Sequence, residues 1–298
     1  MLTRPQVQRF ASQSGLRDLA IAETEIVLTY LLELLGERGF LDKLAFKGGT
    51  CLRKLFIGQG RFSTDLDFTA LHEHDPEAMT IEMMEAFDME FHGITFGLDD
   101  GAYYETQDGL SWGANPTYRH EWNQSGQSEI RLQISRRETP TLETQVHTQC
   151  QQSYFAQLPF APRAIRALAL EEIIAEKIRA CYQRNKARDI YDLRMFATRP
   201  LNQNLVRRLV VLKLWQARDT FDPAKLMAKF EDGKDFDWDD LGQLVRRTEK
   251  IAPSEITATC VANFRFIANL SEDEAKLATD PYGREHALWD RLRTELPS

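Results

Sequence analysis

The chain has 298 residues, a formal net charge of −8, 43% hydrophobic residues and 10% aromatic residues. That apolar share is enough for a sizeable core and excludes a chain that is disordered throughout, and the length favours two domains or one large one. No apolar run reaches the roughly 18 residues of a membrane-spanning helix, and no secretory signal is recognised at the N-terminus. The four cysteines are widely spaced and favour reduced thiols, so we expect a cytoplasmic protein without membrane association.

The charge is unevenly distributed along the chain. Residues 161–218 contain 13 Lys or Arg against 5 Asp or Glu, whereas the remainder carries a formal charge of about −16. A basic stretch in an acidic chain is compatible with a phosphate-binding face. Basic residues scattered around solvated helices are the alternative, and composition alone does not separate the two.

The first predicted elements surround a pair of glycines. Apolar residues recur with a helical period over residues 18–35. A short apolar run at residues 44–46 then meets Gly48-Gly49, which predicts a strand that ends in a tight turn. Thr50 has the side chain of an N-cap, and we expect a short helix behind it over residues 51–56.

A second strand is predicted over residues 64–69, where polar and apolar residues alternate. Residues two apart share a face of a strand, so Asp65 and Asp67 project together while Leu66 and Phe68 point into a core. Two carboxylates on a rigid strand suit a hard cation such as Mg²⁺, which takes oxygen ligands and leaves room for phosphate groups. An exposed strand face with two solvated acids is the alternative.

The glycine pair strengthens the first of these interpretations. Two glycines at a strand end let a ligand approach the backbone, and the following helix directs free N–H groups and its positive dipole end to the same place. Thr50 adds a hydroxyl there, although an ordinary capped turn is the alternative. A phosphate cradle followed 15 residues later by paired carboxylates supplies amides, metal ligands and a fixed line of attack. These are the requirements of transfer from a nucleoside triphosphate.

The kind of secondary structure that the sequence predicts changes near residue 160. Before it, residues 76–91 read as a helix, and the clearest strand among the short alternating runs that follow covers residues 129–135. We therefore predict an α+β fold with a mixed α/β domain over residues 1–160 and an all-helical domain over residues 161–298. In the second domain, helical periods cover residues 168–184, 187–197, 202–218, 222–231, 238–249 and 254–270.

The helical half contains three further charged candidates. Lys177 interrupts the apolar stripe of helix 168–184, so its ammonium requires an anion or water; snorkelling of its long stem is the alternative. Asp189 and Asp192 are three residues apart and are neighbours on the next helix. Alternatively, Asp189 caps that helix and Asp192 pairs with Arg188 on the surface.

The strings FKGGTCLRK (46–54) and RFSTDLDF (61–68) resemble the nucleotidyltransferase-like toxins of the AbiEii/AbiGii and MenT type, in the DNA polymerase β-like superfamily. The resemblance covers roughly residues 20–200, with four motifs in the family's order. It implies a polymerase β-like N-terminal lobe, Mg²⁺ or Mn²⁺ as cofactor, a nucleoside triphosphate as substrate and a cognate antitoxin as partner. The implied reaction is nucleotidyl transfer to an RNA acceptor, for which we expect a tRNA 3′ end. The alternatives are a small-molecule or protein acceptor, and a nucleotide-binding protein without catalysis.

The resemblance also assigns roles to residues. Asp65 and Asp67 are the expected metal ligands, Lys177 contacts a nucleotide phosphate, and either Asp192 or Asp189 organises the catalytic site. We favour Asp192, beside the buried residues of its helix, to orient or deprotonate the acceptor hydroxyl. With Asp65, Asp67 and Lys177, Asp192 forms the expected catalytic set. The expected nucleotide-binding residues, which include side chains flanking the glycine turn, are Gly48, Gly49, Thr50, Lys54, Arg61, Ser63 and Asp189.

One position departs from the superfamily pattern. Superfamily members often carry a third acid between two apolar residues of a central strand, and the counterpart here is Gln133. An amide does not replace the charge of a carboxylate. Either Glu129 or a helical aspartate therefore compensates, or a second metal ion binds only weakly.

Overall fold

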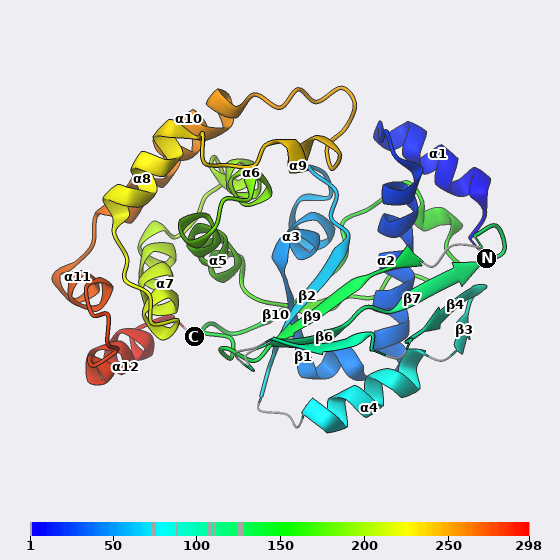
Figure 1. Ribbon diagram of the computed structural model, residues 1–298, viewed down its shortest axis with the longest axis horizontal. Coiled ribbons are helices and arrows are strands. Elements are labelled where there is room, and N and C mark those ends of the chain that lie inside the picture. Colours follow the sequence, from blue (N-terminus) through cyan, green and yellow to red (C-terminus); the bar gives the residue numbers. More distant parts are fainter. Residues whose placement is uncertain are drawn as a thin grey trace. The chain divides into compact units, whose positions relative to one another are not determined.

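The computed structural model describes residues 2–72, 76–87, 89–99, 101–106, 109, 111–123 and 128–297. The chain forms two compact units (Figure 1). Unit 1 comprises Met1–Pro140, Thr144–Leu168 and Gln243–Glu249, and unit 2 comprises Thr141–Glu143, Ala169–Gly242 and Lys250–Ser298.

A mixed seven-stranded sheet dominates unit 1, with the strand order β10-β11-β1-β2-β9-β6-β5. Strand β1 pairs antiparallel with β2 and parallel with β11, and β2 pairs parallel with β9. A smaller sheet has the order β3-β4-β7-β8. The strands are β1 (Leu44–Lys47), β2 (Asp65–Ala70), β3 (Met89–Phe91), β4 (Ile94–Gly97), β5 (Tyr103–Glu105), β6 (Ser111–Ala114), β7 (Thr117–His120), β8 (Ser128–Glu129), β9 (Arg131–Ser135), β10 (Gln145–His147) and β11 (Ile165–Ala167).

Helix α2 (Leu19–Glu37) forms the centre of the helical part of unit 1. It begins at the N-cap Asp18, whose carboxylate accepts a hydrogen bond from the backbone N–H of Ala20 at 2.8 Å. It is buried on almost every side from Ile21 to Leu35, which confirms the helix predicted over residues 18–35. The other helices of unit 1 are α1 (Arg4–Ser14), α3 (Gly48–Cys51), continued by a π-helical turn (Leu52–Ile57), α4 (Pro76–Phe87) and two 3₁₀ turns (Phe40–Lys43 and Phe155–Gln157).

Unit 2 is helical. Helix α5 (Leu170–Gln183) packs against α6 (Ala187–Phe196) and α7 (Gln203–Gln216), and its apolar stripe is buried as the periodicity predicts. The remaining helices are α8 (Pro223–Asp232), α9 (Asp239–Gly242), α10 (Pro253–Phe264), a 3₁₀ turn (Arg265–Ala268), α11 (Glu272–Ala278) and α12 (His286–Thr294). Within the described part of the chain, no helix is long and apolar enough to cross a membrane.

Two predicted helices are wrong at their C-terminal ends. The helix predicted over residues 76–91 ends at Phe87, because Met89–Phe91 instead forms β3 and pairs with β4. The helix predicted over residues 238–249 ends at Gly242, since the following segment belongs to unit 1. There the carbonyl of Leu244 accepts a hydrogen bond from the N–H of Phe62 at 2.7 Å. Hairpin pairing in the first place, and a bond to a distant segment in the second, replace the local helical bonds.

Candidate active site

Gly48 and Gly49, called the glycine turn below, directly follow β1 as the first two residues of α3, and charged side chains approach them closely. Gly48 has a φ of +79°, which favours glycine, and a Cβ atom there would collide with the Asp67 carboxylate. A Cβ atom on Gly49 would collide with the guanidinium of Arg61. The glycine pair therefore lets a carboxylate and a guanidinium lie directly against the start of a helix, where the first backbone N–H groups lack intrahelical acceptors.

Thr50 connects this turn to β2. It lies inside α3 rather than at its N-cap, which is Lys47, so the predicted cap is wrong. Its buried hydroxyl donates a hydrogen bond to the backbone carbonyl of Asp65 at 2.5 Å. Because the only proton of this hydroxyl is used by the strand, we assign Thr50 to the positioning of the turn against β2.

The paired carboxylates lie where the alternation of β2 places them. Leu66 and Phe68 are fully buried, whereas Asp65 and Asp67 are half-buried on the opposite face. The antiparallel register of β1 and β2 sets Asp67 opposite Lys47, the residue before the glycine turn. The two acids and the turn therefore form one surface within unit 1.

A substitution tests how tightly this surface is packed. Gly48→Ala is expected to lower the free energy of unfolding by about 1–2 kcal/mol for the left-handed backbone and by about 1–3 kcal/mol more for displacing the Asp67 carboxylate. Gly101→Ala is the matched control, because Gly101 has a φ of +83° and open space around its would-be Cβ atom. Urea unfolding measures both variants. Equal losses would contradict the close approach of Asp67 to the turn.

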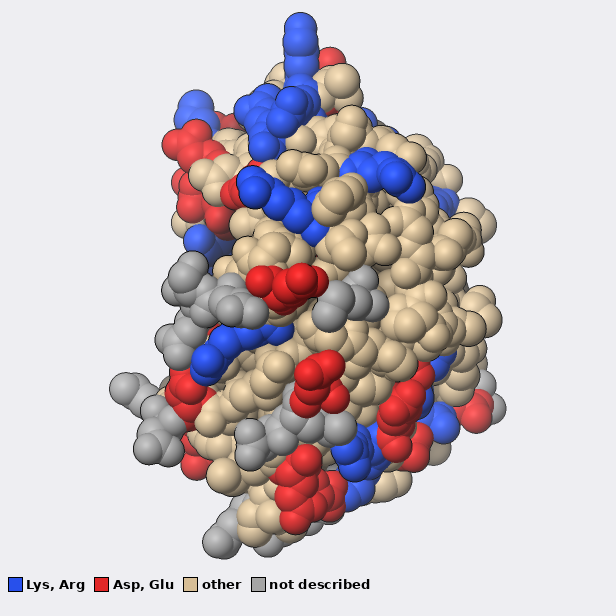
Figure 2. Space-filling model, turned by 90° about the vertical axis from the view of Figure 1, so that its right-hand side faces the viewer, with Lys and Arg blue, Asp and Glu red and all other residues tan. Residues whose placement is uncertain are grey.

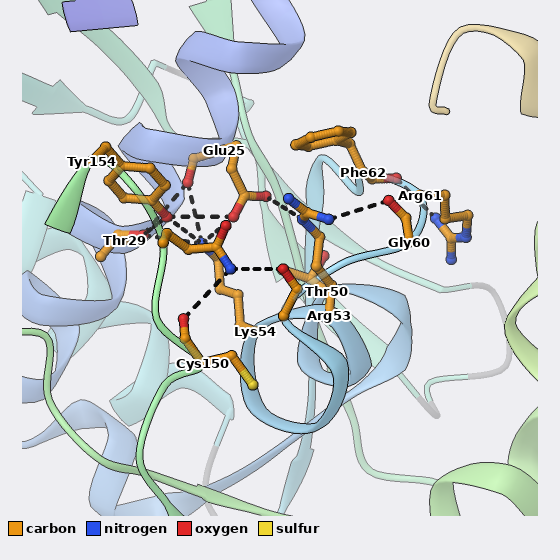
Figure 3. A network of polar contacts seen from close by, with 12 residues as sticks. Glu25, Thr29, Thr50, Arg53, Lys54, Gly60, Arg61, Phe62, Cys150 and Tyr154 are labelled. Atoms are coloured by element: carbon orange, nitrogen blue, oxygen red, sulfur yellow. Dashed lines mark hydrogen bonds and ion pairs between the residues drawn. The ribbon is translucent and has the colours of Figure 1, made fainter. Parts of the chain in front are cut away.

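The predicted flanking residues divide into two groups. The Arg61 guanidinium lies against Gly49, and its Nη1 donates to the backbone carbonyl of Phe62 at 3.2 Å. Ser63 is buried on the segment that leads into β2. Lys54 instead points into the protein interior, toward Glu25 and Thr29 (Figure 3).

Lys54 belongs to a buried network centred on Glu25 of α2 (Figure 3). Its ammonium donates to Glu25 Oε1 at 3.0 Å and to Thr29 Oγ1 at 3.0 Å, and Tyr154 Oη lies 3.4 Å away. Arg53 Nε pairs with Glu25 Oε2 at 3.3 Å. The Lys54 and Glu25 side chains are only 2% and 1% exposed. We therefore leave Lys54 out of the nucleotide site. We assign it to anchoring the π-helical turn Leu52–Ile57, which follows α3, on α2.

The charges in this network control the ionisation of Glu25. Burial acts to raise the pKa of its carboxyl, but the neighbouring charges and hydrogen bonds of Lys54 and Arg53 outweigh burial, so the pKa lies below its ordinary value. Glu25 is therefore a buried carboxylate whose charge depends on two cations from the segment that follows the glycine turn.

Strand β9 brings two more side chains to the surface that carries Asp65 and Asp67. It runs parallel to β2, with Arg131 opposite Asp65 and Gln133 opposite Asp67. Gln133 thus lies beside Asp67, where the resemblance places a third acid, while Glu129 lies on β8 of the smaller sheet. Sequence reasoning missed Arg131, although its position two residues before Gln133 on the same strand was a usable signal.

The three charged candidates of unit 2 form a compact ion-pair cluster. Lys177 Nζ lies 2.9 Å from Asp189 Oδ1 and 2.8 Å from Asp192 Oδ2, and Arg184 Nε lies 2.8 Å from Asp189 Oδ2. Burial acts to raise the pKa of Asp189, but Lys177 and Arg184 hold it far below its ordinary range. Lys186 is the N-cap of α6, and Asp189 lies fully buried in its first turn, which excludes the alternative that Asp189 caps this helix. The anion that the position of Lys177 required is thus supplied by two carboxylates of α6.

The basic stretch at residues 161–218 is largely neutralised in the structure. At least eight of its thirteen cations lie within 4 Å of a carboxylate. The face shown in Figure 2 lies over α1, β3 and β4 rather than over this stretch, and it carries both positive and negative side chains. The charge of the stretch is therefore a weaker argument for a nucleic-acid face than its composition indicates. The eight cations are Arg163, Lys177, Arg179, Arg184, Lys186, Arg207, Arg208 and Lys213.

Comparison with known proteins places these features in a family. The model of the AbiEii nucleotidyl transferase toxin of type IV toxin–antitoxin systems matches residues 30–275. The nucleotidyltransferase toxin MenT4 of Mycobacterium tuberculosis H37Rv superposes with a TM-score of 0.83 and 29% sequence identity, covering 100% of both chains. No protein of curated function matches the sequence.

Two Helicobacter pylori proteins share the fold at lower similarity. One is described as a nucleotidyltransferase and has a TM-score of 0.52 and 22% identity, covering 83% of this chain and 94% of its own. The other, JHP933, has a TM-score of 0.51 and 21% identity, covering 85% and 94%. Because the family model matches well over half of the sequence, this chain belongs to the AbiEii nucleotidyltransferase toxins.

Proposed function

We propose that this toxin transfers a nucleoside monophosphate from a nucleoside triphosphate to a hydroxyl group of RNA, with a tRNA 3′ end as the expected acceptor. The observation that carries the proposal is the surface that holds Asp65 and Asp67, on which Asp67 lies against Gly48 and Arg61 lies against Gly49. Two carboxylates, a guanidinium and the first N–H groups of a helix at one place suit a triphosphate with its metal ion. A toxin acting on cellular RNA would work in the cytoplasm and be restrained by a cognate antitoxin.

The donor set fits a divalent metal ion. Asp65 and Asp67 offer hard oxygen ligands, and the described residues contain no cluster of three His, Cys, Asp or Glu side chains that could hold a metal alone. Mg²⁺ is commonly bound by one or two carboxylates that leave its other positions to phosphate oxygens and water. When bound, Mg²⁺ or Mn²⁺ would neutralise charge on the triphosphate.

The protein's own groups would then orient the reaction. Arg61 and the backbone N–H groups of Gly48 and Gly49 would hold phosphate oxygens, and the buried hydroxyl of Ser63 lies close enough in sequence to assist. The acceptor oxygen forms a bond to the α-phosphorus, the bond from that phosphorus to the β-phosphate oxygen breaks, and pyrophosphate leaves. The acceptor's proton passes to a base. For this base we propose Asp192, and for a phosphate contact Lys177, with Asp189 fixing that lysine; these three roles rest on the family resemblance.

A labelling experiment tests the reaction. The protein is incubated with Mg²⁺, total tRNA and each nucleoside triphosphate in turn, labelled either on the α- or on the γ-phosphate. We expect label from the α-position to appear on the RNA and label from the γ-position to appear in pyrophosphate. Transfer of the γ-label would show a kinase instead. Nucleotide binding without transfer to any acceptor would favour a non-catalytic protein.

Salt dependence distinguishes RNA from a small acceptor. If the acceptor is RNA, the logarithm of its binding constant is expected to fall linearly with the logarithm of the salt concentration. The slope is about −0.7 for each phosphate contacted in a single strand. Because most of the cations at residues 161–218 are paired, we expect a slope of only about −2 to −4. Fluorescence anisotropy with labelled tRNA measures it. A slope near zero would indicate a small-molecule or protein acceptor.

A further inference from the structure

A fixed positive charge lies beside the paired carboxylates. In the parallel pairing of β2 and β9, Arg131 stands opposite Asp65 and Gln133 opposite Asp67. Leu132, between them in sequence, is fully buried, so Arg131 and Gln133 project from the other face. In-register neighbours in a parallel sheet point to the same side, so all four polar side chains share one surface.

The structure holds the Arg131 guanidinium in place without covering it. Its Nε donates to Tyr104 Oη at 3.3 Å, and its Nη2 donates to Gln133 Oε1 at 2.9 Å. Tyr104 is itself fixed, since its hydroxyl donates to the backbone carbonyl of Leu132 at 3.3 Å and its ring occupies the space that a side chain at Gly113 would fill. Among the described residues, these bonds use only two of the five N–H groups that a guanidinium offers.

The electrostatic surroundings favour the charged form and link it to the acids. The hydrogen bond with Tyr104 has the largest effect and raises the pKa of Arg131, whereas partial burial acts to lower it. Charge interactions with Tyr104, Asp65 and Asp67 add smaller effects that raise it, so the pKa lies above its ordinary value. Arg131 is therefore a permanent cation close enough to both carboxylates to interact with their charges, and it keeps N–H groups available to a ligand.

We propose that Arg131 is a further catalytic residue, which binds the α-phosphoryl oxygens beside a single metal ion held by Asp65 and Asp67. The inference rests on the proposed nucleotidyl transfer. Gln133 contributes no charge to hold a second divalent cation, and the neighbouring guanidinium repels one. A guanidinium matches the geometry of two phosphoryl oxygens, so Arg131 supplies at that place the charge that a second metal ion would otherwise supply.

The role of Arg131 in the transfer is that of a hydrogen-bond donor only. The acceptor oxygen bonds to the α-phosphorus as the bond to pyrophosphate breaks. During this step the N–H groups of Arg131 would donate hydrogen bonds to the phosphoryl oxygens and stabilise their negative charge. Arg131 keeps its proton throughout. Tyr104 is a positioning residue, because it acts through the guanidinium that it holds.

Binding of an unreactive substrate analogue tests the proposal without turnover. The α,β-methylene analogues of ATP, CTP, GTP and UTP are titrated separately by calorimetry, and bound Mn²⁺ is counted by electron paramagnetic resonance. We expect one Mn²⁺ per complex of wild-type protein and analogue. Arg131→Met is expected to weaken analogue binding about tenfold or more, as for loss of a charge-assisted bidentate contact, and Arg131→Lys by less. Combining Arg131→Met with Gln133→Asp is expected to admit a second Mn²⁺.

Matched variants separate this role from a structural one. Arg119→Met removes an exposed arginine from β7 and is expected to leave analogue binding unchanged. Tyr104→Phe is expected to weaken binding in the wild-type background but to have no further effect when Arg131 is already methionine. Should Arg131→Met fail to fold, the comparison of Arg131→Lys with wild type carries the test.

The outcomes also separate this inference from the proposed function. Failure of every analogue to bind the wild-type protein would overturn both. Analogue binding with two Mn²⁺ ions in the wild type, or with undiminished affinity in folded Arg131→Met, would overturn the role of Arg131 and leave the nucleotidyl transfer standing.

Discussion

Replacing Asp65 or Asp67 by asparagine is expected to lower the rate of nucleotidyl transfer by about a thousandfold, while the protein remains folded. Asparagine keeps the size of the side chain but removes one of the two charges that would hold the metal–triphosphate complex, and loss of a single preorganised electrostatic group costs about 10²–10³ in rate. Both residues are half-buried on the face opposite Leu66. Their replacement therefore leaves the apolar core of β2 intact. Initial rates of pyrophosphate release measure the effect.

The control for these variants is an exposed aspartate of the same unit. Asp42→Asn, in the 3₁₀ turn before β1, is expected to change the rate by less than about twofold, as a surface substitution away from the site. Circular dichroism checks that each variant is folded. Near-wild-type rates in both folded Asp65→Asn and Asp67→Asn would remove these residues from the catalytic set.

Lys54→Met is expected to produce the largest loss of stability, about 3–5 kcal/mol in the free energy of unfolding. Removing one partner of a buried ion pair leaves an uncompensated charge in the interior, and this costs more than the pair itself contributes. The Glu25 carboxylate would keep Arg53 but lose an ammonium at 3.0 Å. Urea unfolding at neutral pH measures the loss.

A surface lysine provides the contrast. The ion pair of Lys43 with Glu82 is shorter, at 2.6 Å, but its side chains are 35% and 42% exposed. Lys43→Met is therefore expected to cost less than about 1 kcal/mol. A second check is a double-mutant cycle, in which Glu25→Gln added to Lys54→Met costs less than Glu25→Gln alone. Similar small losses for Lys43→Met and Lys54→Met would contradict the anchoring role of the network.

Most of the local architecture around the glycine turn could be predicted from the sequence. The strand at residues 44–46 and the alternation around Asp65 depend on patterns a few residues long, and β1 and β2 confirm them. The helix behind the strand was predictable too, although it begins at Gly48 rather than at residue 51. The need of Lys177 for an anion was predictable too, because a cation in an apolar stripe is costly.

Contacts between residues that are far apart in the sequence could not be predicted in the same way. Lys54 looks like a cradle residue in sequence, because nothing near it indicates that its partner is Glu25, 29 residues earlier on α2. The spacing of Arg131 from Gln133 indicates a shared strand face, but the register that sets β9 beside β2 is needed to place Arg131 opposite Asp65. Likewise, the composition of residues 161–218 does not reveal that Glu274 and Glu33, far away in sequence, neutralise several of its arginines.

Cleavage of the backbone by a bound iron ion can locate the metal–nucleotide complex on the chain. Fe²⁺ replaces Mg²⁺ in the presence of an α,β-methylene triphosphate, and ascorbate with peroxide generates hydroxyl radicals that cut the backbone next to the metal. We expect cuts within residues 47–50, 65–67 and 131–133, which the turn, β2 and β9 bring together, and their loss in Asp65→Asn. Nucleotide-dependent cuts that avoid all three segments would contradict the assignment of the active site to this surface.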